Sequence, residues 1–222
     1  MPLAGIGAQA PGDRKVKKTI WMPLVLGGAL GLLDLVSLAV DFPIPLGPLG
    51  ATGPQEILLT MSAALGGPLG VLAASPRHEL GITFFFLSDQ LPPEQMSSTG
   101  ALFSVADLVA HILALLAVAY GYRFLQTRAK KVATFCAGWV LIVVLYYGFL
   151  VPLQSFLLGL VIADKPTLSA LFQNNLPEFL VVVIITTLFI LALPRRYRRP
   201  LWYDPKQAPD RTRQIRAEQK VL

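Results

Sequence analysis

Long apolar runs, separated by short polar, proline-rich or basic segments, dominate the hydrophobic pattern of this chain. A bilayer core of about 30 Å requires a helix of about 20 apolar residues. Runs near or beyond that length occupy Ile20–Val40, Ala101–Tyr122, Val132–Ala163 and Glu178–Pro194. The pattern predicts an all-α fold, namely a polytopic bundle of transmembrane helices.

A further apolar block, Ile57–Ser75, is interrupted by Gly66-Gly67-Pro68, and this break bears on the number of helices. Either a short helix turns at the break and a second helix rises to about Leu87, or the block forms a re-entrant hairpin. One unbroken helix would put the basic residues after Tyr122 on the wrong side of the membrane. We therefore expect six helices, with one pair short or broken near Gly66-Gly67-Pro68.

Prolines and glycines mark the expected loops. They crowd into Asp41–Pro54, and because they fix or free the backbone φ angle, this segment is predicted to be an ordered loop. Pro76–Gly100 is polar and is expected largely on the outer side. Pro152 is expected to end the helix from Val132, before a bent or interfacial continuation. Asp164–Pro177 is expected to be a loop.

Composition strengthens the membrane interpretation. Of the 222 residues, 54% are hydrophobic and 14% are charged, whereas a soluble domain usually has about 25% charged residues. The formal net charge of +6 comes from basic residues that flank the apolar runs. That placement is typical of the positive-inside rule and argues against a nucleic-acid partner.

The basic residues gather before the first run, after Tyr122 and after the last run. These clusters are Arg14 to Lys18, Arg123 to Lys131 and Arg195 to Arg199. The positive-inside rule predicts that all of them are cytoplasmic. We expect the protein in the inner (plasma) membrane, with residues 1–18 and 196–222 as cytoplasmic tails and residues 19–195 as the bundle domain.

The sequence carries no recognised catalytic motif. It has no G-x-x-x-x-G-K-[ST] phosphate loop, no H-E-x-x-H helix and no G-x-S-x-G elbow. Its single cysteine, Cys136, lies in an apolar run without a nearby histidine. We therefore expect neither an enzyme nor a bound cofactor.

Ionisable side chains inside the runs are the candidates for a binding site, because such groups are costly in a bilayer and usually functional. The expected lining consists of Asp34, Glu56, Arg77, Asp107, His111 and Glu178. Under the predicted topology, Asp34 and Asp107 lie about 9 Å from the outer ends of their helices. Glu56 and Glu178 lie near outer helix starts. The positions predict an outward-facing pocket for a small molecule, with the loop Pro43–Gly53 as a lid.

Structural roles stay open for the same residues. Asp34 and Asp107 can instead pair with Arg77 or bond to neighbouring helices. In the six-helix arrangement, Arg77, His78 and Glu79 fall near mid-membrane, where they must face the protein interior or water. A metal site is disfavoured, because Asp107 and His111 are too few ligands and the chain has only two histidines.

Small residues at Gly27 and Gly31 give the first helix a face for close packing, within the chain or with a partner helix. The aromatic residues Trp139, Tyr146 and Tyr147 are expected in the core or at the membrane interface.

The stretch Phe42–Ala74 resembles the substrate-binding (S) components of energy-coupling-factor transporters. The shared features are a Pro/Gly-rich loop (Pro43–Gly53), a short second helix (Ile57–Leu65) and the turn Gly67-Pro68-Leu69-Gly70. Related small modules of bacterial sensor proteins share this signature. The resemblance implies about six helices, cytoplasmic termini, an outward-facing pocket, and separate coupling and ATPase subunits. It also implies that the Gly27 face packs against the coupling subunit.

The sequence thus predicts a small-molecule uptake component that relies on separate energising subunits. The alternative is a non-transporting membrane module, either a sensor or an assembly subunit of a larger complex. An enclosed polar pocket lined by the candidate residues would favour uptake, whereas lipid-facing Asp107 and His111 would count against it.

Overall fold

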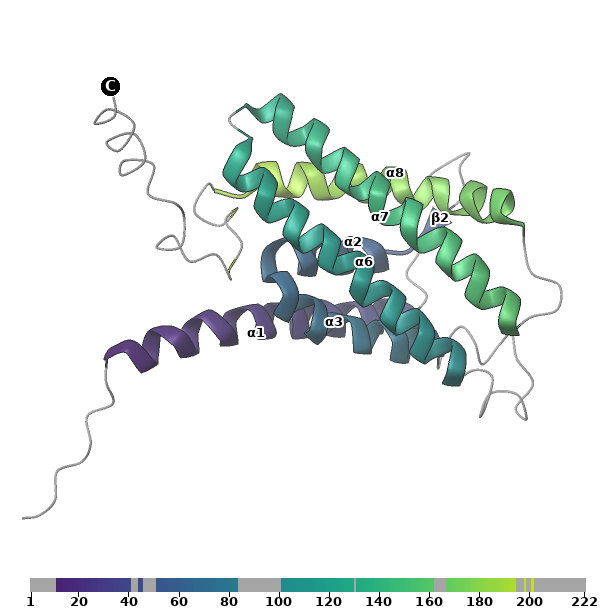
Figure 1. Cartoon of the computed structure of the whole chain (residues 1–222), viewed down its shortest axis with the longest axis horizontal. Coiled ribbons are helices and arrows are strands. Elements are labelled where there is room, and N and C mark those ends of the chain that lie inside the picture. Colours follow the sequence, from purple (N-terminus) through teal and green to yellow (C-terminus); the bar gives the residue numbers. More distant parts are fainter. Residues whose placement is uncertain are drawn as a thin grey trace, which may run out of the picture.

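The computed structural model describes residues 11–40, 44–45, 51–83, 101–129, 131–161, 167–194, 198 and 201. Its elements are α1 (Pro11–Ala39), β1 (Ile44–Pro45), β2 (Ala51–Thr52), α2 (Gln55–Met61), the π-helical turn η2 (Ser62–Gly66), α3 (Gly67–Gly81), α6 (Ala101–Arg128), α7 (Val132–Val161) and α8 (Leu168–Ala192). Figure 1 shows the helices packed side by side in one bundle.

Five helical segments of the described chain are long and apolar enough to cross a membrane. They are Ile20–Ala39, Gln55–Gly81, Ala101–Arg128, Val132–Leu157 and Leu168–Ala192. Large apolar side chains such as Leu32, Val105 and Leu188 are exposed on the outside of the bundle, as lipid contact requires. The protein is therefore a multi-pass integral membrane protein with an all-α fold, as the apolar runs predict.

The second of these segments folds back on itself at the Gly-Gly-Pro sequence. The α-helix gives way to η2, and Gly67 has φ 64° and ψ −154°, a conformation that a side chain would strain. Pro68 occupies the first turn of α3, where a missing N–H is tolerated. Across the turn, the Ser62 hydroxyl donates to the Gly70 carbonyl oxygen at 2.9 Å. The chain breaks where the sequence predicts, and α2 and α3 form a hairpin (Figure 1).

The tip of the hairpin reaches one end of the bundle. The N–H of Leu201, beyond α8, donates to the Leu65 carbonyl oxygen at 2.8 Å. A Cβ on Gly66 would lie 3.4 Å from the Pro23 carbonyl oxygen. We call this end the basic end, because the last turns of α6, with their arginines, and the end of α8 also lie there (Figure 1). The hairpin therefore turns at the basic end, and both its legs run from there into the bundle (Figure 1).

The helices α7 and α8 are longer than predicted. Pro152 lies inside α7, which continues to Val161, and the expected break near Val151 is wrong. Pro177 lies inside α8, which begins at Leu168, so most of the expected loop is helical. The Thr167 hydroxyl starts α8 by accepting a bond from the Ala170 N–H at 3.2 Å. Membrane helices tolerate internal proline, because neighbouring groups satisfy the freed carbonyls.

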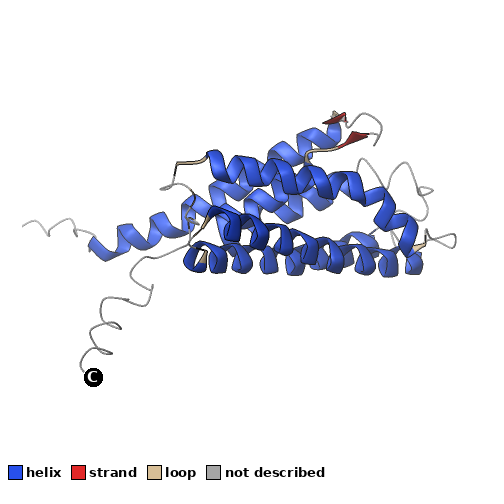
Figure 2. Ribbon diagram, turned by 90° about the horizontal axis from the view of Figure 1, so that it is seen from above, coloured by secondary structure: helices blue, strands red, loops and turns tan. Residues whose placement is uncertain are grey.

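Other boundaries differ in smaller ways. Helix α1 begins at Pro11, within the expected tail. Helix α3 continues through Pro76 to Gly81, in agreement with the predicted helix that rises from the Gly-Gly-Pro break towards Leu87. Ile44 pairs with Thr52, and Pro45 with Ala51, so part of the expected ordered loop is a two-residue antiparallel pairing. It lies at the end of the bundle away from the basic end (Figure 2). Residues 41–43, 46–50 and 84–100, which include most of the expected lid, lie outside the described chain.

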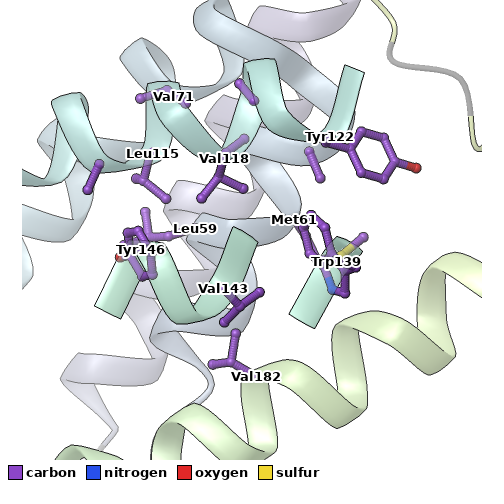
Figure 3. Close-up of a cluster of buried hydrophobic side chains, with 14 of the residues drawn as sticks. Leu59, Met61, Val71, Leu115, Val118, Tyr122, Trp139, Val143, Tyr146 and Val182 are labelled. Atoms are coloured by element: carbon purple, nitrogen blue, oxygen red, sulfur yellow. The ribbon is translucent and has the colours of Figure 1, made fainter. Parts of the chain in front are cut away.

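A buried apolar core lies between α2, α3, α6, α7 and α8 and reaches the basic end. Leu59 and Met61 of α2 pack between α6 and α7 (Figure 3). Tyr122 meets Trp139 edge-on, with ring centroids 5.5 Å apart. The Trp139 Nε1–H donates to the Thr186 hydroxyl at 2.9 Å and ties α7 to α8.

The glycine face of α1, formed by Gly27 and Gly31, packs against α3 of the same chain. A Cβ on Gly27 would lie 2.4 Å from the Gly70 carbonyl oxygen, and a Cβ on Gly31 would lie 2.9 Å from the Ala74 Cα. Helices α1 and α3 can approach this closely because these positions are small. The sequence left open whether Gly27 and Gly31 pack within the chain or against a partner helix, and in the structure α3 covers their face.

Gly27→Ala is expected to destabilise the protein by about 1–3 kcal/mol, because the added methyl group meets backbone that cannot move aside. Gly28→Ala is the matched control, since the nearest atom to its Cβ would be the Arg77 guanidinium at 3.9 Å. Thermal unfolding of both variants in detergent, followed by tryptophan fluorescence, measures the difference. Equal unfolding midpoints for the two variants would contradict the packing described above.

Candidate functional site

Six ionisable side chains from α1, α2, α3 and α6 lie buried together in the half of the bundle away from the basic end. They are Asp34, Glu56, His78, Glu79, Asp107 and His111, and each is at most 8% exposed. We call them the ionisable cluster. Buried charges are rare unless they are paired or bind an ion, so this cluster is the candidate functional site.

The close packing of α1 on α3 brings the first pair together. Gly27 lies beside Gly70 and Gly31 beside Ala74, and one further turn along both helices places Asp34 beside His78. Their atoms Oδ2 and Nδ1 are 3.0 Å apart. The Ser37 hydroxyl donates to the Asp34 backbone carbonyl at 2.8 Å and leaves the Asp34 carboxylate to His78.

His111 of α6 is the centre of the cluster. Its ring centroid lies 5.0 Å from that of His78. Its Nδ1 is 3.4 Å from Asp107 Oδ2, one turn earlier on the same helix, and 3.3 Å from Glu79 Oε1. Its Nε2 is 3.5 Å from Glu56 Oε1. One imidazole therefore contacts carboxylates from three helical elements.

Helix α7 supplies an aromatic wall. The Tyr146 hydroxyl donates to Glu56 Oε2 at 2.5 Å, and the Tyr147 ring packs edge-on against Tyr146 with centroids 5.2 Å apart. Glu178 of α8 is half-buried and lies within electrostatic range of Tyr147 and Glu56. It stands at the margin of the cluster.

Several atoms of the cluster lack hydrogen-bond partners within the described chain. They are Asp34 Oδ1, both carboxylate oxygens of Glu79, Asp107 Oδ1 and His111 Nε2. An unsatisfied buried polar group costs about 1–3 kcal/mol, and more if it is charged. Such an accumulation is unusual in a purely structural core and is typical of a site that receives an ion or ligand.

Two groups of three residues could hold a metal ion, and they share His111. One group is Glu56, His78 and His111, and the other is Glu79, Asp107 and His111. In each group, one ligand atom per residue lies within 4.8 Å of the other two. The sequence argument against a metal site counted the pair Asp107 and His111 on one helix and the two histidines of the chain. It did not include the carboxylates that other helices bring to His111.

The structure brings together four of the six candidate residues, Asp34, Glu56, Asp107 and His111, and Glu178 lies beside them. Asp107 and His111 face the protein interior and not lipid. Their role in binding a ligand stays a prediction.

Arg77 does not join the cluster, which corrects its expected place in the lining. Its guanidinium donates to the Ala73 carbonyl oxygen, and its Cδ would lie 3.1 Å from a Cβ on Gly31. Successive residues of a helix point about 100° apart. Because His78 and Glu79 point into the bundle, Arg77 is turned towards α1.

Sequence reasoning did not select His78, Glu79 or Tyr146 as site residues. His78 and Glu79 could have been selected, because they lie in an otherwise apolar hairpin, where a charged side chain must face the protein interior. Tyr146 gave no such signal, since a tyrosine in a membrane helix is ordinarily a packing or interface residue.

No protein-family model, curated protein or solved structure matches the chain significantly. The functional argument therefore depends on the chemistry of the ionisable cluster itself.

Proposed function

We propose that this membrane protein is a small-molecule uptake component and that its solute is a cation bound at the ionisable cluster. The observation that carries the proposal is the excess of buried carboxyl groups over cationic side chains. Asp34, Glu56, Glu79 and Asp107 supply the carboxyl groups, and His78 and His111 are the basic partners in the ion-pair contacts of the described cluster.

The charges of the cluster do not balance without an added cation or added protons. With all four carboxylates ionised and both imidazoles protonated, the net charge is −2. Removing an ion from water costs several kcal/mol even after the protein relaxes. A bound cation would offset the excess charge, and its loss would leave the unsatisfied atoms described above.

The position of the cluster supports uptake from outside. If the basic end faces the cytoplasm, as the positive-inside rule predicts, the cluster lies in the outer half of an inner (plasma) membrane protein. The apolar core around Leu59, Val71 and Leu115 then separates a bound cation from the cytoplasm. Release would require a conformational change, so separate coupling and ATPase subunits would supply the energy. They would dock away from the Gly27 face, which α3 covers.

Binding can be tested on the purified full chain with simple cations. We expect at least one probe among K⁺, Mg²⁺, Zn²⁺, tetramethylammonium and spermidine to raise the Tm in detergent. Asp107→Asn should reduce that rise, because it removes one carboxylate next to His111. All the probes are compared at the same ionic strength, which controls for nonspecific salt effects. If no cation stabilises the wild-type chain more than the variant, the proposal fails.

Uptake can be tested through the partners of the protein. Purification from the membranes of its own host should bring down a membrane coupling protein and ATPases. A bound cation without such partners would favour the alternative, a sensor or assembly subunit, over uptake.

A further inference from the structure

We infer that the cation is a divalent transition-metal ion held by Nε2 of His78, Nε2 of His111 and Oε1 of Glu56. This inference deepens the proposed function, because it names the class of cation at the same site. It depends on which atoms of the three residues carry free lone pairs.

The hydrogen bonds of His111 determine which of its nitrogens can bind a metal. Nδ1 lies 3.1 Å from the Asp107 backbone carbonyl oxygen. A carbonyl oxygen only accepts hydrogen bonds, so Nδ1 carries the proton. In the neutral ring, Nε2 then has the free lone pair, and it has no hydrogen-bond partner among the described residues. It faces Glu56 Oε1 at 3.5 Å.

His78 is also held through its Nδ1. Its Nδ1 lies 3.0 Å from Asp34 Oδ2, and the fully buried Asp34 carboxylate accepts the Nδ1–H. The Nε2 of His78 is therefore the nitrogen left to bind a metal. Metal-binding histidines usually donate their other N–H to a carboxylate or a backbone carbonyl, which fixes the ring and raises its basicity. Both histidines here have such a partner.

The third ligand, Glu56, is held in place by Tyr146 of α7. The Tyr146 hydroxyl donates to Glu56 Oε2 at 2.5 Å, which leaves Oε1 free. Oε1 and His111 Nε2 are both lone-pair acceptors, and they face each other with no donor of the described chain between them. Two acceptors in this position need a proton or a cation between them, and a metal ion would satisfy both lone pairs. Ligands around a tetrahedral ion at about 2.1 Å lie about 3.4 Å apart, close to the 3.5 Å observed.

The ligand set favours transition metals over Mg²⁺ and Ca²⁺. Two imidazoles and one carboxylate suit Zn²⁺, Co²⁺, Ni²⁺ or Fe²⁺, whereas Mg²⁺ and Ca²⁺ prefer oxygen ligands alone. The second candidate group, Glu79, Asp107 and His111, would have to use Nδ1 of His111. That nitrogen is already bonded to the Asp107 carbonyl, so we assign the ion to the first group.

The test is metal binding by the full chain, purified through a tag without histidine and stripped with a chelator. Because the chain has two histidines, both in the cluster, any ion with two imidazole ligands must sit there. We expect one equivalent of Zn²⁺ to bind, with Mg²⁺ and Ca²⁺ weaker by more than about 100-fold. X-ray absorption of the Zn²⁺ complex should show two imidazole nitrogens at about 2.0–2.1 Å.

Single variants test the assignment of ligands. His78→Gln and His111→Gln should each weaken Zn²⁺ binding by more than about 100-fold, a larger loss than positioning residues cause. The matched control is Ser37→Ala, which removes a buried hydroxyl that bonds to the Asp34 backbone carbonyl but removes no charge and no ligand, and it should change affinity by less than about 3-fold. Because a variant can fail to fold, circular dichroism accompanies each titration, and the absorption spectrum of the wild-type complex gives the ligands without any substitution.

The outcomes separate this inference from the proposed function. If Zn²⁺, Co²⁺ and Ni²⁺ all fail to bind while spermidine or K⁺ stabilises the chain, the metal assignment is wrong and cation binding stands. If Zn²⁺ binds without histidine ligands, the assignment is also overturned. If Zn²⁺ binds through both histidines but no energising partner is found, the metal site stands and uptake fails.

Discussion

Replacing Asp34 by asparagine is expected to weaken Zn²⁺ binding by about 10- to 100-fold, although Asp34 is not a ligand. The carboxylate is fully buried and lies 3.0 Å from His78 Nδ1. It positions the imidazole and makes Nε2 more basic. Asparagine keeps the size of the side chain but removes the negative charge, so the ring can stay in place while its affinity for the ion falls. Zn²⁺ titration of the purified variant measures the loss.

Ser37→Ala is the matched control for Asp34→Asn. Ser37 is buried one turn further along α1, and its hydroxyl bonds only to the Asp34 backbone carbonyl among the described contacts. Its loss perturbs the same helix without touching His78. The visible absorption spectrum of bound Co²⁺ should change in Asp34→Asn and not in Ser37→Ala, because the spectrum reports the ligand field of the ion. Equal affinities and spectra in the two variants would show that Asp34 has only a structural role.

Hydropathy predicted the spans because a bilayer imposes a length and a composition on every helix that crosses it. Counting 1.5 Å per residue also placed Asp34 and Asp107 at a common depth, and the structure brings both to the histidines. The break at Gly67 was predictable because few residues other than glycine adopt its backbone angles. These predictions use properties of single helices.

What the sequence did not reveal depends on how helices are rotated and where they bend. Arg77, His78 and Glu79 are consecutive, and a rotation of α3 by one residue would exchange their roles. That rotation is set by the contact of Gly70 and Ala74 with α1, which is a tertiary property. Prolines at 152 and 177 were treated as helix ends, although both lie inside helices. The metal ligands are spread over α2, α3 and α6, so their spacing in the sequence does not resemble a metal motif.

Glu79→Gln is expected to stabilise the metal-free protein by about 1–3 kcal/mol, contrary to the usual effect of changing a buried residue. Glu79 is 5% exposed, and neither of its oxygens has a hydrogen-bond partner within the described residues. It lies close to Asp107, so the two carboxylates repel each other unless a proton or cation is present. Glutamine has nearly the same shape, carries no charge, and can donate to the unsatisfied Asp107 oxygen. A rise in Tm of the chelator-treated variant measures the gain.

The same substitution should reduce the stabilisation that Zn²⁺ provides. A ligand stabilises the folded state by RT ln(1 + [L]/Kd), and Glu79 lies 3.3 Å from Nδ1 of the metal-binding His111. Loss of its charge weakens the support of that imidazole, so saturating Zn²⁺ should raise the Tm of Glu79→Gln less than that of wild type. Ser37→Ala, which changes no charge in the cluster, should show the same Zn²⁺-induced rise in Tm as wild type. If Glu79→Gln instead lowered the Tm equally with and without Zn²⁺, Glu79 would be an ordinary structural partner of His111. The excess of carboxyl groups over basic side chains in the cluster would then give no support to a cation site.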